Sequence, residues 1–171
     1  MVKGLGAVSE YASTVVRLFP DYAGSVIWFP SPVPYQETEL DPRLIGDLQS
    51  WEASYYAGLT SDYEWRTAGL GARFHAESAR LARRLADQIG DAFQVEHDSG
   101  ESHRRVRGAG PARNPAAAAA FQRLADAARD EWVHRRRAVD DARGDGQALA
   151  WRADQVSHPR TRSGGTPRTD R

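Results

Sequence analysis

The sequence contains no cysteine. This absence excludes disulfide bonds, thiolate zinc sites, iron–sulfur clusters and a cysteine nucleophile. It also contains no apolar run approaching the length of about 18 residues that a transmembrane helix needs. The first residues lack a basic segment followed by an apolar block, so we expect no secretory signal and a cytoplasmic location.

Net charge is also absent, because 23 Lys+Arg balance 23 Asp+Glu. The balance conceals two halves of opposite sign. Residues 1–98 carry 8 basic and 14 acidic side chains, a net of −6, and residues 99–171 carry 15 and 9, a net of +6. Such halves can attract each other or present different faces to partners. Lysine occurs once against 22 arginines, which together with the alanine excess is typical of a GC-rich genome.

Large apolar residues are concentrated in the first half of the chain. Residues 14–98 contain 28 of them and residues 99–171 only 9. We therefore expect a loose N-terminal arm at 1–13, one domain at 14–143 and a disordered tail at 144–171. The tail contains arginine, glycine and proline but too few large apolar groups to offset the entropy of ordering.

The hydrophobic periodicity predicts an α+β domain. The expected strands cover 14–19, 25–29 and 92–98, with a polar edge strand at 103–107, and the expected helices cover 42–58, 66–89 and 115–142. Asp41-Pro42 and Asn114-Pro115 each place a side-chain acceptor before a proline, which is typical of a helix start. The order ββααβ(β)α predicts a two-layer sandwich, with a small three- to four-stranded sheet and helices on one face.

Aromatic side chains gather around the proline-rich loop at 30–35 and along 51–65. A small domain needs such side chains for its core, but tryptophan and tyrosine are also the preferred anchors of protein interfaces. Adjacent tyrosines project about 100° apart on a helix, so at most one of Tyr55 and Tyr56 faces the core. The candidate partner-binding residues are Tyr22, Trp28, Tyr35, Tyr55 and Tyr56.

A basic cluster lies on the expected edge strand. Arg104, Arg105 and Arg107 have no acid between them and are the candidate anion-binding residues. The arginines of the helix at 115–142 instead alternate with aspartates and glutamates, a pattern typical of a solvated helix with salt bridges. The edge strand and the C-terminal tail are therefore where a polyanion would bind.

Signals for metal binding and catalysis are weak. His97 and His103 flank a turn that contains Asp98 and Glu101, a set that suits a divalent ion, but no third clear ligand completes it. The sequence has no Gly-x-Ser-x-Gly elbow and no phosphate loop. We therefore predict no metal, no cofactor and no identified catalytic residue, although a site assembled from distant residues stays open.

The segment Val16-Arg17-Leu18-Phe19-Pro20-Asp21-Tyr22-Ala23-Gly24, followed by Trp28, resembles the opening of a group of small uncharacterised actinobacterial proteins. The similarity continues through residues 48–51, 85–90 and 93–95, and departs from the pattern at Ala23 and Ile27. That group has no established activity. The resemblance implies a folded domain over about residues 15–98 and carries over no functional residue.

Three functions stay open on this basis. The first is a non-catalytic protein-interaction module, of an antitoxin-like, immunity-like or accessory kind, with another protein as its partner. The alternative is a binder of nucleic acid or another polyanion through Arg104, Arg105, Arg107 and the tail. The third is a small hydrolase or transferase whose catalytic residues are dispersed along the chain.

Overall fold

The computed structural model describes the backbone of residues 14–156 and the side chains of residues 14–143. The expected arm at 1–13 and residues 157–171 of the expected tail lie outside the described residues. The chain is divided into two compact units, Met1–Trp132 and Val133–Arg171. The first unit contains the sheet and its helices.

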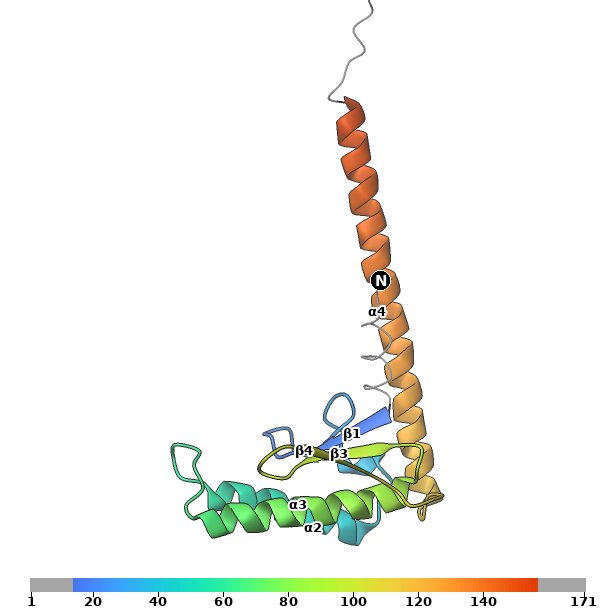
Figure 1. Cartoon of the computed structure of the whole chain (residues 1–171). Helices are drawn as coiled ribbons and strands as arrows, with labels where there is room; N and C mark the ends of the chain where they lie inside the picture. Colours follow the sequence, from blue (N-terminus) through green and yellow to red (C-terminus); the bar gives the residue numbers. More distant parts are fainter. Residues whose placement is uncertain (1–13, 157–171) are drawn as a thin grey trace, which may run out of the picture. The chain divides into compact units, whose positions relative to one another are not determined.

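A four-stranded mixed sheet forms the centre of the first unit (Figure 1). Its strands are β1 (Val15–Leu18), β2 (Ile27–Trp28), β3 (Gln94–Asp98) and β4 (His103–Arg107), in the order β2-β1-β3-β4. β1 is antiparallel to β2 and parallel to β3, and β3 is antiparallel to β4. The α+β prediction is confirmed, and so is the edge strand at 103–107.

The second strand is shorter than the predicted range 25–29. Local hydrogen bonds form at both of its ends, although the backbone nitrogen of Phe19 still donates to the Val26 carbonyl at 3.1 Å. The Ser25 hydroxyl accepts from the backbone nitrogen of Ile27 at 3.2 Å, and the backbone nitrogen of Phe29 donates to the Ser31 carbonyl at 2.7 Å. These turns leave only Ile27–Trp28 paired with β1.

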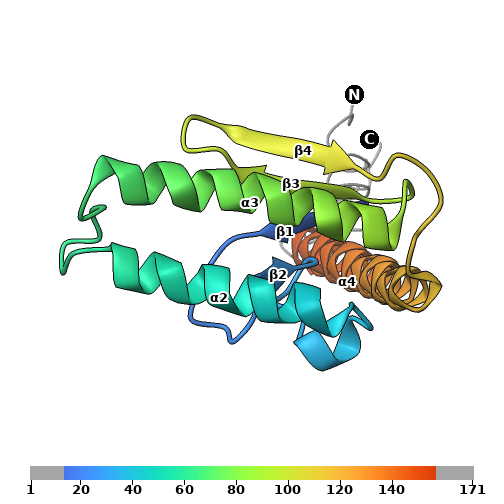
Figure 2. The same cartoon turned by 90° about the horizontal axis from the view of Figure 1, so that it is seen from below.

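Two helices, α2 (Pro42–Gly58) and α3 (Ala68–Ile89), lie side by side on one face of the sheet (Figure 2). The Asp41 side chain caps α2 by accepting from the backbone nitrogen of Arg43 at 2.8 Å, as the sequence predicts. The Thr67 hydroxyl caps α3 in the same way, so this helix begins two residues after the predicted start at 66. A short 3₁₀ helix, η1 (Tyr35–Glu37), precedes α2.

The core lies between the sheet and these helices. Val16 of β1 pairs in register with Val95 of β3, and both side chains are fully buried. Residues of α4 (Pro115–Val156) complete the core, because the Phe121 ring lies 5.9 Å from Phe29 and 6.2 Å from Phe93 between centroids. The largest side chains that are fully buried are Ile27, Leu44, Leu48, Leu81, Leu85, Ile89 and Phe121.

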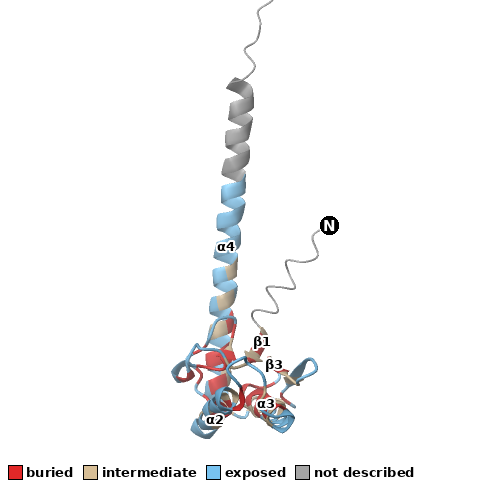
Figure 3. Ribbon diagram, turned by 90° about the vertical axis from the view of Figure 1, so that its left-hand side faces the viewer, coloured by how far each residue is buried: buried red, intermediate tan, exposed pale blue. Residues whose placement is uncertain are grey.

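The helix α4 runs further than predicted. Its expected end at about residue 142 is wrong, because the backbone stays helical through Gly144 and Gly146 to Val156. Each glycine costs a helix only about 1 kcal/mol relative to alanine, and the residues around them are mostly good helix formers. Residues 144–156 of the expected disordered tail are therefore helical. The described side chains of residues 133–143 are all exposed (Figure 3).

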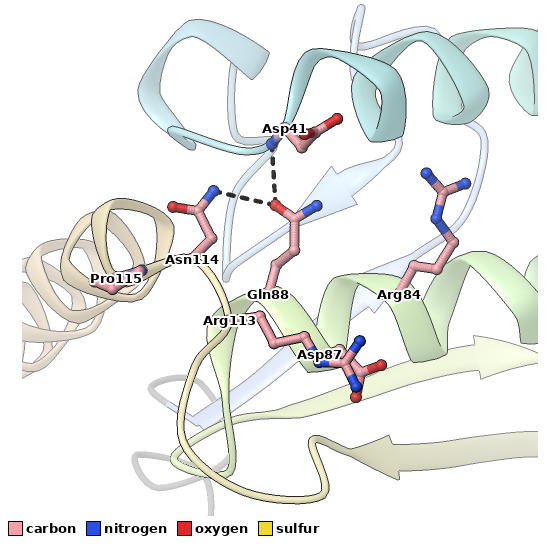
Figure 4. A pocket seen from close by; sticks show the side chains of 7 residues that line it. All are labelled: Asp41, Arg84, Asp87, Gln88, Arg113, Asn114 and Pro115. Carbon is pink, nitrogen blue, oxygen red and sulfur yellow. Dashed lines mark hydrogen bonds between the residues drawn. The ribbon is translucent and has the colours of Figure 1, made fainter.

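A polar pocket of about 430 Å³ lies where α2 and α4 begin and α3 ends (Figure 4). The Gln88 side-chain oxygen accepts from the backbone nitrogen of Asp41 at 3.0 Å and from Asn114 Nδ2 at 3.2 Å. Asn114 Nδ2 also donates to the Glu39 carbonyl at 2.8 Å. These bonds join the starts of α2 and α4 to the end of α3. The polar groups of this pocket therefore have a structural role.

Within the described part of the chain, no helix combines the length and the apolar character needed to cross a bilayer.

Candidate functional site: an aromatic pocket with a tyrosine rim

Three regions of the chain, residues 18–20, 51–78 and 98–100, supply five segments that meet at the end of the sheet opposite the start of α4 (Figure 2). They are the end of β1, the middle of α2, the α2–α3 connection, the start of α3 and the β3–β4 turn. Together they enclose a hollow of about 380 Å³, which we call the aromatic pocket. Its lining residues are Leu18, Phe19, Pro20, Trp51, Tyr55, Trp65, Phe74, His75, Ser78, Asp98 and Gly100.

Stacked rings form the walls of the aromatic pocket. Trp51 stacks on Phe74 with centroids 4.6 Å apart, and Trp65 lies 5.1 Å from Phe74. Tyr55 meets Trp65 edge-on at 5.7 Å. Trp51 Nε1 also donates to the Phe74 carbonyl at 3.1 Å. The ring stack and this bond hold the wall residues of α2 and α3 in one arrangement.

Two glycines make room for the Trp65 ring. A Cβ atom at Gly58, the last residue of α2, would lie 2.7 Å from Trp65 Cζ3. A Cβ atom at Gly71, in the first turns of α3, would lie 2.9 Å from Trp65 Cδ1. Both distances are shorter than van der Waals contact allows. Glycine at these two helix positions therefore seats the tryptophan against the pocket.

Two residues that line the aromatic pocket contain a buried polar atom with no hydrogen-bond partner among the described residues. Ser78 is 1% exposed, and neither its hydroxyl oxygen nor His75 Nδ1 has a hydrogen bond there. Leaving a buried polar group without a bond costs about 1–3 kcal/mol. Asp98 Oδ1 accepts from the backbone nitrogen of Gly100 at 2.7 Å, within the β3–β4 turn. The lining of the pocket contains no lysine and no arginine.

Exposed tyrosines border the aromatic pocket. Tyr22 is 80% exposed, Tyr63 72% and Tyr56 36%. The Tyr56 ring lies 5.3 Å from the Tyr22 ring and 5.3 Å from the Tyr55 ring, which joins this group to the pocket wall. We call Tyr22, Tyr55, Tyr56 and Tyr63 the tyrosine rim.

The electrostatic surroundings of the rim are acidic. A hydrogen bond with Tyr63 raises the pKa of Tyr22, and the charge of Asp21 adds to the rise. Burial raises the pKa of Tyr56, and the neighbouring Glu52 raises it further. Burial also raises the pKa of the Glu52 carboxyl. Each of these shifts comes from burial, acidic neighbours or other tyrosines, so Tyr22 and Tyr56 are uncharged at neutral pH.

Three of the five predicted partner-binding residues are brought together here: Tyr22, Tyr55 and Tyr56. Trp28 is half-buried and stacks on Phe19, with ring centroids 4.7 Å apart. Tyr35 is 7% exposed, and its hydroxyl accepts from the backbone nitrogen of Val26 at 3.3 Å. The proline-rich loop therefore folds Tyr35 into the core, where the sequence analysis expects a contact with a partner.

The sequence analysis leaves Tyr63 out of the candidate set. This residue adopts a positive φ of 61° in the connection between α2 and α3. The Thr60 hydroxyl accepts there from the backbone nitrogens of Asp62 and Glu64, each at 3.3 Å. The sequence does indicate that Tyr63 is exposed. A tyrosine in a turn among Thr, Ser and Asp does not lie on a helix face that could bury it.

The candidate anion-binding arginines do not form one patch. In the register of β4, Arg104 pairs with His97, whereas Arg105 pairs with Glu96, so these two side chains point to opposite faces. Arg105 Nε also donates to the Glu96 carboxylate at 2.7 Å. The alternation of the strand therefore divides the basic run that is continuous in sequence.

The two histidines considered for metal binding are also separated. Asp98 pairs with His103 and His97 with Arg104, which places the two imidazoles on opposite faces of the sheet. Across the described residues, no group of three or more His, Asp or Glu side chains is placed to hold a metal ion.

His97 is buried on the face of the sheet that α3 covers, with 4% exposure. Burial lowers its pKa below the ordinary 6.5, and the charge of Arg83 acts in the same direction, against the hydrogen bond to the Asp98 carbonyl. Around and below pH 6.5 the unfolded chain thus binds more protons than the folded chain. His97 therefore does not reduce the free energy of unfolding above pH 6.5. The free energy of unfolding decreases as the pH falls from 6.5 through the lower folded pKa.

We therefore expect His97→Gln to flatten the dependence of stability on pH between about pH 5 and pH 8. The measurement is the free energy of unfolding in urea at several pH values, for the wild type and the variant. The carboxyls of Asp47 and Glu77, whose pKa values are lowered by hydrogen bonds from Arg84 and Arg80, act only below about pH 4.5. An unchanged slope in the variant would show that another group causes the dependence.

Comparison with known proteins bears on the same part of the chain. Residues 14–100 match the family described as Serratia CdiI immunity protein-like, which is just over half of the 171 residues. No curated protein and no solved structure matches significantly. Every residue that lines the aromatic pocket, from Leu18 to Gly100, lies inside the matched segment, whereas β4 and α4 lie outside it. The chain belongs to the Serratia CdiI immunity protein-like family.

Proposed function

We propose that this protein is an immunity protein that binds a toxin protein and blocks its action, with the aromatic pocket and the tyrosine rim as the contact surface. The observation that carries this proposal is that the tyrosine rim lies next to the aromatic pocket, within the segment that the family matches. The tyrosine rim contains three of the five large hydrophobic side chains that are exposed among the described residues. It adjoins a pocket whose entire lining lies within the family match.

The physical argument is that of interface hot spots. Tyrosine and tryptophan offer large contact areas with few rotatable bonds, and a hydroxyl or indole N–H that can also form a hydrogen bond. A pocket at the centre of such a surface can hold one anchoring side chain and exclude water around it. The ring stack of Trp51, Trp65 and Phe74 keeps the pocket in shape before binding, which lowers the entropy cost of association.

The test begins with capture by the tagged full-length chain from lysate of its own host. The captured protein is then produced in a test bacterium, alone or together with this chain. We expect growth arrest when the captured protein is alone and recovery when the chain is present. A captured protein that does not harm growth, or harm that this chain does not relieve, would contradict the proposal.

The contact surface is tested with a matched pair of double variants. Tyr22→Ala with Tyr63→Ala removes two strongly exposed rim residues, and we expect affinity for the captured toxin to fall at least about 30-fold. Val133→Ala with Val139→Ala removes two exposed apolar residues of α4, at 38% and 49% exposure, and should leave the affinity unchanged. Equal loss in both variants, or in neither, would exclude the rim as the contact surface.

A further inference from the structure

One side of α3 faces the edge strand β4 (Figure 2). A Cβ atom at Gly100, in the β3–β4 turn, would lie 2.9 Å from His75 Cδ2. A Cβ atom at Gly108, directly after β4, would lie 2.6 Å from the carbonyl oxygen of Ala86. The helix and the strand therefore run side by side between these two close approaches.

Arg83 lies on this side of α3. Because residues four apart in a helix are neighbours on its surface, His75, Ala79 and Arg83 follow one another along the side next to β4. The adjacent Arg84 points to the other side of the helix, where its guanidinium binds the Asp47 carboxylate of α2. The side chain of Arg83 is exposed. It therefore places a positive charge at the boundary between α3 and β4.

Arg104 projects from β4 toward the same boundary. It pairs in register with His97, which is buried on the sheet face that α3 covers, so the two side chains share this face. Burial lowers the pKa of the His97 imidazole, and the charges of Arg83 and Arg104 lower it further. One arginine from the helix and one from the strand therefore lie near the same buried histidine.

The two arginines are not neutralised by acidic side chains. Within the described part of the chain, neither the Arg83 nor the Arg104 guanidinium forms a hydrogen bond or an ion pair. Asp87, four residues after Arg83, lines the polar pocket together with Arg113 (Figure 4). Asp98 neighbours His97 on β3, and its side chain projects to the opposite face of the sheet. Two like charges without a counter-charge create a positive potential that attracts an anion.

We infer that Arg83 and Arg104 form a binding site for a phosphate group at the boundary between α3 and β4. A guanidinium is planar and donates parallel N–H bonds to two oxygens of one phosphate. Two guanidiniums match the double charge of a phosphate better than the single charge of a carboxylate. Neither α3 nor β4 contributes a residue to the tyrosine rim, so the site goes beyond the proposed function and does not depend on it.

The probe is inorganic phosphate, titrated into the full-length protein at constant ionic strength and at several pH values. NMR follows the imidazole signal of His97, which is identified by its disappearance in His97→Gln. A bound phosphate offsets the positive charge of the two arginines, so we expect it to raise the pKa of His97. The rise should saturate, with a dissociation constant in the millimolar range. Acetate at the same ionic strength should leave the pKa of His97 unchanged.

Three variants locate the site. Arg83→Gln and Arg104→Gln each remove one charge from an exposed side chain, and each should weaken phosphate binding about tenfold. Arg107→Gln is the matched control, because Arg107 pairs with Gln94 and projects from the same strand to the opposite face of the sheet. It should bind phosphate as the wild type does. Without phosphate, the first two variants should each raise the pKa of His97, and the control should not.

A second titration distinguishes the sources of the phosphate group. A short single-stranded oligonucleotide that binds more tightly than inorganic phosphate would support the site and assign it to a nucleic-acid backbone. Tighter binding of inorganic phosphate would support the site and assign it to free phosphate or a phosphomonoester.

Three outcomes would overturn the inference. They are a pKa of His97 that phosphate does not change, an equal rise with acetate, and equal loss of phosphate binding in Arg107→Gln and Arg83→Gln. Each of them leaves the proposed function intact, because relief of toxicity is measured separately.

Discussion

Replacing Phe121 by alanine is expected to lower the free energy of unfolding by about 3–5 kcal/mol, the usual cost of removing a buried phenylalanine. Phe121 is 0% exposed and packs against Phe29 and Phe93. This residue lies beyond residue 100, where the family match ends. A measured loss of this size would show that the stability of the fold depends on α4 as well as on the matched segment.

The measurement is urea unfolding at equilibrium, monitored by tryptophan fluorescence and by circular dichroism. Val139→Ala on the same helix is the control, since Val139 is 49% exposed and its removal should change stability by no more than about 0.5 kcal/mol. A loss below about 1 kcal/mol for Phe121→Ala would show that the first unit folds without this helix.

Replacing Gly71 by alanine is expected to lower the free energy of unfolding by about 1–2 kcal/mol, although the same change usually stabilises a helix. The new methyl group would lie 2.9 Å from Trp65 Cδ1, so the tryptophan must leave its position against the pocket. The fluorescence of Trp65 should shift to longer wavelength as the ring becomes exposed. Capture of the toxin partner should weaken with it.

Gly46→Ala in α2 is the matched control. A Cβ atom at Gly46 meets no atom within 4 Å, and the residue is exposed. Alanine at this helix position should raise the free energy of unfolding by about 0.5–1 kcal/mol. The two glycine substitutions are thus expected to have opposite signs. Stabilisation by Gly71→Ala as well would mean that Trp65 does not need the space that this glycine leaves.

Much of the fold follows from local sequence. The helix α2 (Pro42–Gly58) has the predicted bounds, because Asp41-Pro42 sets its start by chemistry that acts within a few residues. The strand at 103–107 is polar except for Val106 and lies at an edge of the sheet, where no further strand pairs with it. The end of α4 was not predicted, since Gly144 and Gly146 only weaken a helix and do not force it to stop.

The candidate site follows from the sequence only in part. Composition and spacing identified Tyr22, Tyr55 and Tyr56 as a surplus of aromatic residues suited to an interface. They did not show that the proline-rich loop folds Tyr35 inward, where its hydroxyl meets the backbone of Val26. Nor did the sequence show that Ser78 lies beside the same pocket as Asp98.

By itself, then, the sequence determined the elements of this protein, the density of its first half in large apolar residues and the kinds of side chain available for binding. Each of these is a local property, set by periodicity, capping and composition within one segment. Only the tertiary structure decided which of those side chains share a pocket. The reason is physical: parallel pairing of β1 with β3 and packing of α3 on the sheet bring Phe19, Trp65, His75 and Asp98 together, and such contacts depend on the packing of the whole core.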